Sequence, residues 1–265
     1  MTKKFKNVAV LVLALSIVIT FTGCSKKSEE TSNDVSWENV KDNGKITVGL
    51  CAAYPPFESR NDKTGELEGF DIDLAKLLGS ELGIEVEIKD AEWPALLGGL
   101  NKGDFDVLIT CMSKREAAAE NVNMSDVYYE LNDVIIVKEG RNDINSIEDL
   151  KNKIVGVQLG SGSEQVVDKL DGLKEVKRYD YNPEAFIDLE NDRIDCVVVG
   201  YAYAVNYMKE NEGFRLVDEA LESAEIVMVL RQGEDGLTNK LNESLSKIKE
   251  NGKYDEILNK WLKVN

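Results

Sequence analysis

The chain has 265 residues, a formal net charge of −17 and no histidine. So acidic a protein is not expected to bind nucleic acid or anionic lipid through charge. The lack of histidine removes the commonest general base and the commonest metal ligand, and we expect neither a cofactor nor a metal.

The chain begins with a segment that has the features of a secretory leader. Three lysines precede an apolar run of 14 residues, Val8–Phe21, which is shorter than the roughly 20 residues that a membrane-spanning helix needs. The run ends in small residues and Cys24, which resembles the bacterial lipoprotein cleavage box, although Phe21 stands where leucine is usual. The resemblance implies a signal peptide over residues 1–23, acylation of Cys24 (palmitate among the lipids), and anchoring on the extracytoplasmic face of the cell membrane. An ordinary secretory leader is the alternative.

A polar segment, residues 24–37, follows the leader. It consists mainly of Ser, Lys, Glu, Thr, Asn and Asp and has too few apolar residues to form a core, so it predicts a flexible tether. No second apolar stretch is long enough to cross a membrane, so only the lipid is expected to reach the bilayer.

The next residues alternate between apolar strands and amphipathic helices, which is typical of an α/β unit with a mostly parallel sheet. We expect a helix with apolar residues at helical spacing from Phe70 to Leu82, ended by Gly83, and another from Ser113 to Asn121 that opens with a capping box. A short helix follows Trp93. The strands of this unit are expected at 46–50, 84–88 and 107–110.

A second unit with the same alternation follows. Strands are expected at 153–158, 176–179 and 196–199, and helices at 164–170 and 183–191, the latter with a proline at its start. Two long helices close the chain.

Two extended apolar runs, Val134–Lys138 and Ile226–Leu230, lie between the units. They predict two hinge crossovers, with one lobe formed by residues 38–133 plus 227–265 and the other by 134–226. The alternative is one continuous sheet, which would need many strands around a single core.

Several motifs resemble, in order and spacing, the solute-binding proteins of polar amino-acid ABC importers, which are the bacterial extracellular solute-binding protein family 3. They stand at 46–49, 53–57, 69–75, 103–106, 125–129, 155–163 and 251–255. The resemblance implies an α/β, two-lobed, periplasmic-binding-protein-like (type II) fold. It also implies a monomer that closes on a small polar solute and delivers it to an ABC permease and its ATPase.

The resemblance also implies a set of ligand contacts. Tyr54 and Trp93 match two rings that sandwich the ligand, and Ser161–Ser163 matches a loop whose N–H groups and hydroxyls meet a ligand carboxylate. A core tryptophan and a simple helix cap are the alternatives for Trp93 and for the loop. The positions that match ligand contacts are Cys51, Tyr54, Trp93, Thr110, Cys111, Ser113, Arg115, Gln158, Ser161, Gly162, Ser163 and Gly200.

The sequence departs from the family at the charged positions. Ala118 stands where most members have the arginine that grips the ligand carboxylate, and Gly200 where they have the aspartate that holds the ammonium. Many members also have an acid at the position of Cys51. Two explanations are open: Arg115 replaces the lost arginine, or the site is rebuilt for a less charged solute, which we favour because one shifted arginine cannot replace the acids.

The cysteines leave alternatives open. Cys51 and Cys111 follow two strands of the first unit, and they form a disulfide, a soft-ligand pair or two small buried apolar residues, of which we favour the last. Cys196 begins an apolar strand and is expected in the core.

We expect a binding protein rather than an enzyme. A lyase of the cyclohexadienyl-dehydratase type is the first alternative, but without histidine it would depend on Glu58, Tyr54 or Lys114 as a base. A stand-alone ligand sensor is the second alternative.

Overall fold

The computed structural model describes residues 34–262, and the expected leader, Cys24 and most of the expected tether lie outside this range. Helix α1, Ser36–Asn43, begins inside the range 24–37 that composition predicts to be a tether. Asp34 and Ser36 accept hydrogen bonds from the backbone N–H groups of Gly236 and Leu237, at the start of a helix about two hundred residues later. The first described residues therefore cap a C-terminal helix.

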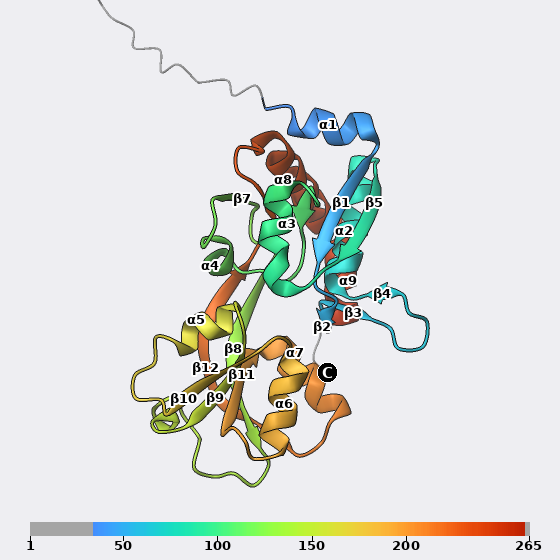
Figure 1. Cartoon of the computed structure of the whole chain (residues 1–265). Coiled ribbons are helices and arrows are strands. Elements are labelled where there is room, and N and C mark those ends of the chain that lie inside the picture. The colour runs from blue at the N-terminus through green and yellow to red at the C-terminus, as the bar shows by residue number, and fades with distance from the viewer. Residues whose placement is uncertain (1–33, 263–265) are drawn as a thin grey trace, which may run out of the picture. The chain divides into compact units, whose positions relative to one another are not determined.

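The first lobe has a five-stranded sheet (Figure 1). Its order is β5 (Glu85–Asp90), β1 (Lys45–Leu50), β6 (Val107–Leu108), β13 (Val229–Arg231) and β7 (Val122–Met124). Strand β1 runs parallel to β5 and β6, whereas β13 is antiparallel to β6 and β7. The expected mostly parallel core of this unit is present, and the antiparallel strand comes from near the C-terminus.

Helices surround this first sheet. They are α2 (Phe70–Leu82), the 3-10 turn η1 (Trp93–Ala95), α3 (Leu96–Lys102), α4 (Lys114–Ala117), α8 (Asp235–Glu250) and α9 (Lys253–Trp261). Gly83 ends α2 in the left-handed conformation, as expected. The backbone just before α2 requires Gly69, because its φ is 137° and a Cβ there would lie 2.2 Å from the carbonyl oxygen of Phe57.

A small sheet extends the first lobe beside β1. Its strands are β2 (Ala53–Tyr54), β3 (Glu58–Arg60) and β4 (Leu67–Glu68). It carries the aromatic loop that follows β1 and thereby fixes the position of Tyr54.

The second lobe has its own five-stranded sheet, in the order β10 (Glu175–Tyr179), β9 (Ile154–Gln158), β11 (Cys196–Gly200), β8 (Tyr129–Lys138) and β12 (Phe214–Ile226). Its helices are η2 (Glu148–Leu150), α5 (Gly162–Val167), α6 (Asn182–Glu190) and α7 (Tyr201–Glu210). Val197 and Val199 of β11 pack in one buried cluster while Cys196 and Val198 pack in another. Because side chains alternate along a strand, the sheet is buried on both faces, which explains the unbroken apolar sequence of β11.

The chain passes between the two sheets at two paired segments (Figure 1). Ser125–Tyr128 leads into β8, and Val227–Met228 leads out of β12. Backbone hydrogen bonds join Ser125 to Met228 and Tyr128 to Ile226, at 2.9 Å each. The two expected crossings exist, but the run Val134–Lys138 lies inside the second sheet and not between the lobes.

One other expectation is corrected, and one strand was not predicted at all. The helix expected to reach Asn121 ends at Ala117, because Val122–Met124 pairs with β13 as strand β7. The long strand β12 was not expected, since its sequence is rich in Glu, Asp and Ala; antiparallel pairing with β8 overrides that local preference.

Candidate functional site

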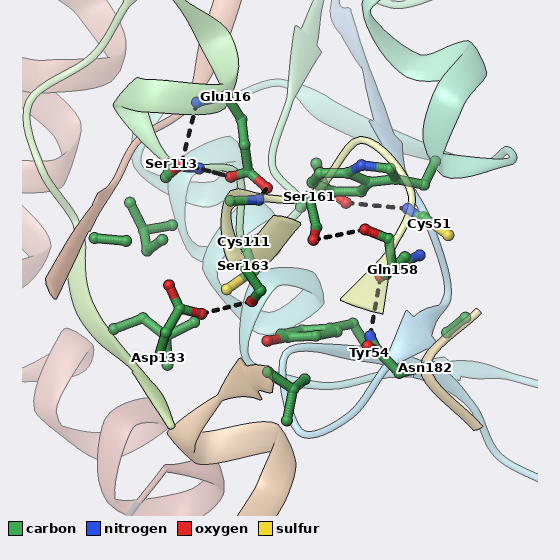
Figure 2. A pocket seen from close by; sticks show the side chains of 18 residues that line it. Cys51, Tyr54, Cys111, Ser113, Glu116, Asp133, Gln158, Ser161, Ser163 and Asn182 are labelled. Carbon is green, nitrogen blue, oxygen red and sulfur yellow. Dashed lines mark hydrogen bonds between the residues drawn. The ribbon is translucent and has the colours of Figure 1, made fainter. Parts of the chain in front are cut away.

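A cavity between the two lobes is lined by the ends of strands and by the loops that follow them (Figure 2). Ten of the twelve residues expected to contact ligand line it: Cys51, Tyr54, Trp93, Thr110, Cys111, Ser113, Gln158, Ser161, Gly162 and Ser163. Arg115 and Gly200 do not. The residues that the sequence did not indicate are Ala53, Glu116, Leu131, Asp133, Asn182, Val199, Ala224 and Ile226.

The first lobe contributes Thr110 and Cys111, which follow β6 after one intervening residue. The Thr110 hydroxyl accepts from the Cys51 N–H at 3.1 Å and donates to Glu58 at 2.9 Å. Cys111 has a φ of 49°, an unusual value for a residue with a side chain. Its N–H donates to Asp71 at 2.6 Å, so a buried carboxylate below the cavity helps to hold this backbone.

Beneath the cavity, Glu58 and Asp71 form a buried pair of carboxyl groups. Both side chains are almost fully buried, and burial raises the pKa of Asp71 to about 7 and the pKa of Glu58 well above its usual range. Two adjacent negative charges in a dry interior cost much free energy. The pair therefore keeps a proton at pH values well above those at which carboxyl groups ordinarily lose theirs.

The two cavity-lining aromatic residues also link the lobes. The Tyr54 ring stacks on Tyr203 of α7, with centroids 4.8 Å apart and an interplanar angle of 25°. The Trp93 indole N–H donates to the carbonyl of Gly160, in the loop after β9, at 3.2 Å. Each ring of the first lobe therefore has a partner in the second lobe, and each also faces the cavity.

In the second lobe, the loop after β9 is held by its own hydrogen bonds. Ser161 caps α5 by accepting from the Glu164 N–H at 3.1 Å, and its hydroxyl donates to the carbonyl of Gln158 at 2.8 Å. The Gln158 amide is bound to Asn182 and to the carbonyl of Asp180, at 2.9 and 3.0 Å. The polar groups of this loop are thus fixed before any ligand arrives.

Glu116 reaches across the cavity from α4 to this loop (Figure 2). One carboxylate oxygen accepts from the backbone N–H and the hydroxyl of Ser113, at 2.6 Å each. The other accepts from the backbone N–H of Gly162 in the second lobe. Burial raises the pKa of the Glu116 carboxyl, although the donors at Ser113 and Gly162 oppose that rise.

Asp133 of β8 is the second carboxylate of the cavity. It is 5% exposed and accepts a hydrogen bond from the Ser163 hydroxyl at 2.6 Å. Burial raises the pKa of this carboxyl, and the hydrogen bond from Ser163 and the charge of Arg115 act in the opposite direction. Together with Glu116, it gives the cavity wall an acidic character.

Arg115, which the sequence offers as a replacement for the missing arginine, does not line the cavity. Its guanidinium lies 2.8 Å from Glu222 and 3.7 Å from Asp133, and it donates to the Gly162 carbonyl at 3.3 Å. Successive helical residues point about 100° apart, so when Glu116 faces the cavity its neighbour Arg115 faces the rim. Ala118, at the family's arginine position, is exposed.

Gly200 is excluded from the lining because the Tyr54 side chain lies against it. A Cβ at this position would be 2.4 Å from the Tyr54 hydroxyl and 2.6 Å from Leu131. The aspartate that the family usually has here would not fit.

Cys51, Cys111 and Cys196 are buried free cysteines, which excludes the disulfide alternative. Burial raises the pKa of Cys51 to about 11, so its thiol keeps its proton. Within residues 34–262, no group of three or more His, Cys, Asp or Glu side chains is placed to hold a metal, and no helix is long and apolar enough to cross a bilayer.

Comparisons with known proteins agree with this architecture. The family model of the bacterial extracellular solute-binding proteins, family 3, matches residues 46–264. The arginine-binding extracellular protein ArtP of Bacillus subtilis (strain 168) is 31% identical, over 97% of this chain and 98% of that protein.

Solved structures are similar as well. An ancestral arginine-binding protein bound to arginine is 40% identical, with a TM-score of 0.78 over 83% of this chain and 99% of that one. The ancestral amino acid-binding protein AncCDT-1, described as a precursor of cyclohexadienyl dehydratase, is 33% identical, with a TM-score of 0.78 over 85% of this chain and 99% of that one.

Proposed function

Because the chain belongs to the bacterial extracellular solute-binding proteins of family 3, we propose that it captures a small polar solute, an amino acid or an amino-acid-like compound, for an ABC importer. The solute enters between the lobes, and the closed form delivers it to the membrane permease, whose ATPase drives uptake.

One observation carries this proposal: the cavity takes its lining from both lobes, and within residues 34–262 the chain passes between these lobes at two paired segments. A solute that contacts both walls stabilises the closed form by its difference in affinity between the closed and open forms. The permease would then distinguish a loaded protein from an empty one by its shape.

The remaining parts of the proposal concern location and assembly. Cleavage after residue 23 and acylation of Cys24 anchor the mature protein, as a monomer, on the extracytoplasmic face of the membrane. The sequence around Cys24 supports this, and a Cys24→Ser variant is expected to lose its membrane association on cell fractionation. Recovery of this variant in the membrane fraction, at the wild-type level, would argue against the anchor.

The proposal excludes enzymatic turnover. The two acids of the cavity wall, Glu116 and Asp133, are engaged by Ser113, Gly162 and Ser163, and the sequence has no histidine to serve as a base. Incubation with a prephenate-like acid is expected to leave it unchanged. Measurable elimination would instead support the dehydratase alternative.

The direct test is a thermal-unfolding screen against amino acids, their amides, and the corresponding amines. At least one compound is expected to raise Tm in a concentration-dependent way, because it binds only the folded protein. Trp93→Ala should reduce that rise, whereas Tyr201→Ala, on an exposed side chain of α7 outside the cavity, should not. If no compound shifts Tm while circular dichroism shows an intact fold, the proposal fails.

A further inference from the structure

From the charges that face the cavity, we infer that its solute is a small organic cation without a carboxylate, such as a decarboxylated amino acid. This inference rests on the proposed function and narrows it to one chemical class. Compounds such as agmatine and cadaverine belong to this class, whereas arginine and lysine carry the extra carboxylate.

The first reason is that the hydrogen-bond donors suited to a ligand carboxylate are already bonded to a carboxylate of the protein. The N–H of Gly162 donates to Glu116, and so do the N–H and hydroxyl of Ser113. The Glu116 side chain is only 8% exposed, so this carboxylate is part of the cavity wall. A ligand carboxylate would have to displace it and leave a buried charge without its partners, which is costly.

The second reason is that no lysine or arginine side chain of residues 34–262 lines the cavity. Arg115 contacts two of the lining residues, Asp133 and Gly162, and its terminal nitrogens are engaged by Glu222, by Asp133 and by the carbonyl of Gly162. The buried Nε of Arg115 has no hydrogen-bond partner, but Arg115 is not a lining residue, so an anionic ligand group would meet no positive side chain among the residues that line the cavity.

The third reason is that the cavity wall favours a positively charged ligand. Glu116 and Asp133 both face the cavity from poorly solvated positions, where opposite charges attract and like charges repel more strongly than in water. The rings of Tyr54 and Trp93 add two further surfaces that suit a cation. The same wall would repel the carboxylate of an amino acid.

Matched pairs of compounds test this inference: arginine with agmatine, and lysine with cadaverine, each titrated calorimetrically into the full chain in detergent. The members of a pair differ only in the carboxylate. At least one amine is expected to bind about tenfold or more tighter than its amino acid, as one unfavourable charged contact implies.

If the amino acid binds more tightly than its amine in every pair that shows binding, the inference is overturned but the proposed function stays in place. Binding of no compound, neither these nor the wider screen, to a protein with an intact fold removes the proposed function and the inference together.

Variants then identify the groups responsible. Glu116→Gln keeps a capping-box side chain but loses the charge. It should therefore weaken amine binding about tenfold and reduce the difference in affinity between the amine and its amino acid. Glu120→Gln removes an exposed acid from the segment just after α4 and should change neither the amine affinity nor that difference. If both Glu116→Gln and Asp133→Asn keep the wild-type preference for the amine, these two carboxylates are not the cause of that preference.

Discussion

The ring of Tyr54 stacks on the ring of Tyr203 with a centroid distance of 4.8 Å, although the two residues belong to different lobes. The Tyr54 hydroxyl lies against the backbone of Gly200, one residue before α7. The two lobes therefore meet at this point through a ring contact and at a backbone position that has no side chain.

Gly200→Ala is expected to oppose closure. The φ of Gly200 is −60°, which suits alanine, so the penalty comes from the overlap of the new methyl group with Tyr54 and Leu131. Small-angle scattering should show a larger radius of gyration in the presence of ligand, and calorimetry a weaker affinity.

Tyr54→Phe removes the atom closest to the new methyl group, so the double variant should recover part of the lost affinity. Gly98→Ala is the matched control, since a Cβ there meets nothing within 4 Å in α3, and it should stabilise the fold by roughly 0.5–1 kcal/mol. Wild-type affinity in Gly200→Ala would show that the Tyr54 contact is not needed for closure.

The buried pair Glu58 and Asp71 predicts a stability that falls as pH rises. Burial raises the pKa of Asp71 to about 7 and that of Glu58 well above 4.5, so the folded state keeps a proton that the unfolded state releases. This contribution is fully present below the unfolded pKa values and is lost as pH rises through about 7. The free energy of unfolding in urea should be lower at pH 8 than at pH 6 by ~1 kcal/mol.

Glu58→Gln should flatten this dependence, because an amide can donate to Asp71 and accept from Thr110 without titrating. Glu87→Gln, an exposed carboxylate beside Lys45, should leave the difference between pH 6 and pH 8 as in the wild type. A wild-type slope in Glu58→Gln would contradict the assignment to this pair.

Arg115→Ala should not abolish ligand binding, because the guanidinium lies outside the cavity lining. Its removal takes a competing cation away from Asp133, 3.7 Å distant, and should strengthen the binding of a cationic solute by a few-fold. Calorimetry should compare the affinity of this variant with that of the control Lys114→Ala. The Lys114 side chain pairs with the exposed Glu225. Complete loss of binding in Arg115→Ala alone would restore it as the replacement for the missing arginine.

The three described cysteines should react slowly while the protein is folded. Burial raises the pKa of Cys51 to about 11 and of Cys196 to about 12, and also raises that of Cys111, so almost no thiolate is present at pH 8. Mass spectrometry after iodoacetamide treatment should find them unmodified in buffer and alkylated in guanidinium chloride. Failure of any of them to alkylate in denaturant without reductant would indicate a disulfide.

The sequence predicts much of the fold because strand and helix signals alternate regularly through both lobes. The helix that ends at Gly83 and the buried strand that begins at Cys196 are found where the local pattern places them. Strand β12 is different, since residues such as Glu219 and Glu222 favour no strand by themselves. Its pairing with the partner strand β8 stabilises this conformation in the folded protein.

The site is predictable where a family motif marks it and less so where a side chain crosses between lobes. Tyr54, Trp93 and Thr110, which match ligand-contact positions of the family, line the cavity. The capping box alone accounts for a glutamate at position 116, so the sequence gives no sign of a role in the cavity. The contact of Glu116 with Gly162, 46 residues further along the chain, exists only in the folded protein. Arg115 does not line the cavity, because its neighbour Glu116 on the same helix faces it.

Asp34 and Ser36, which cap α8, bind the start of the described chain to the first lobe. An anchor at Cys24 would consequently be joined to the protein through the first lobe, and the second lobe would be linked to the membrane through the first. Shortened forms for biophysical work should begin upstream of Asp34. A start at Trp37 would remove two acceptors from the N-terminus of α8, whose own N-cap residue, Glu234, makes no side-chain capping hydrogen bond.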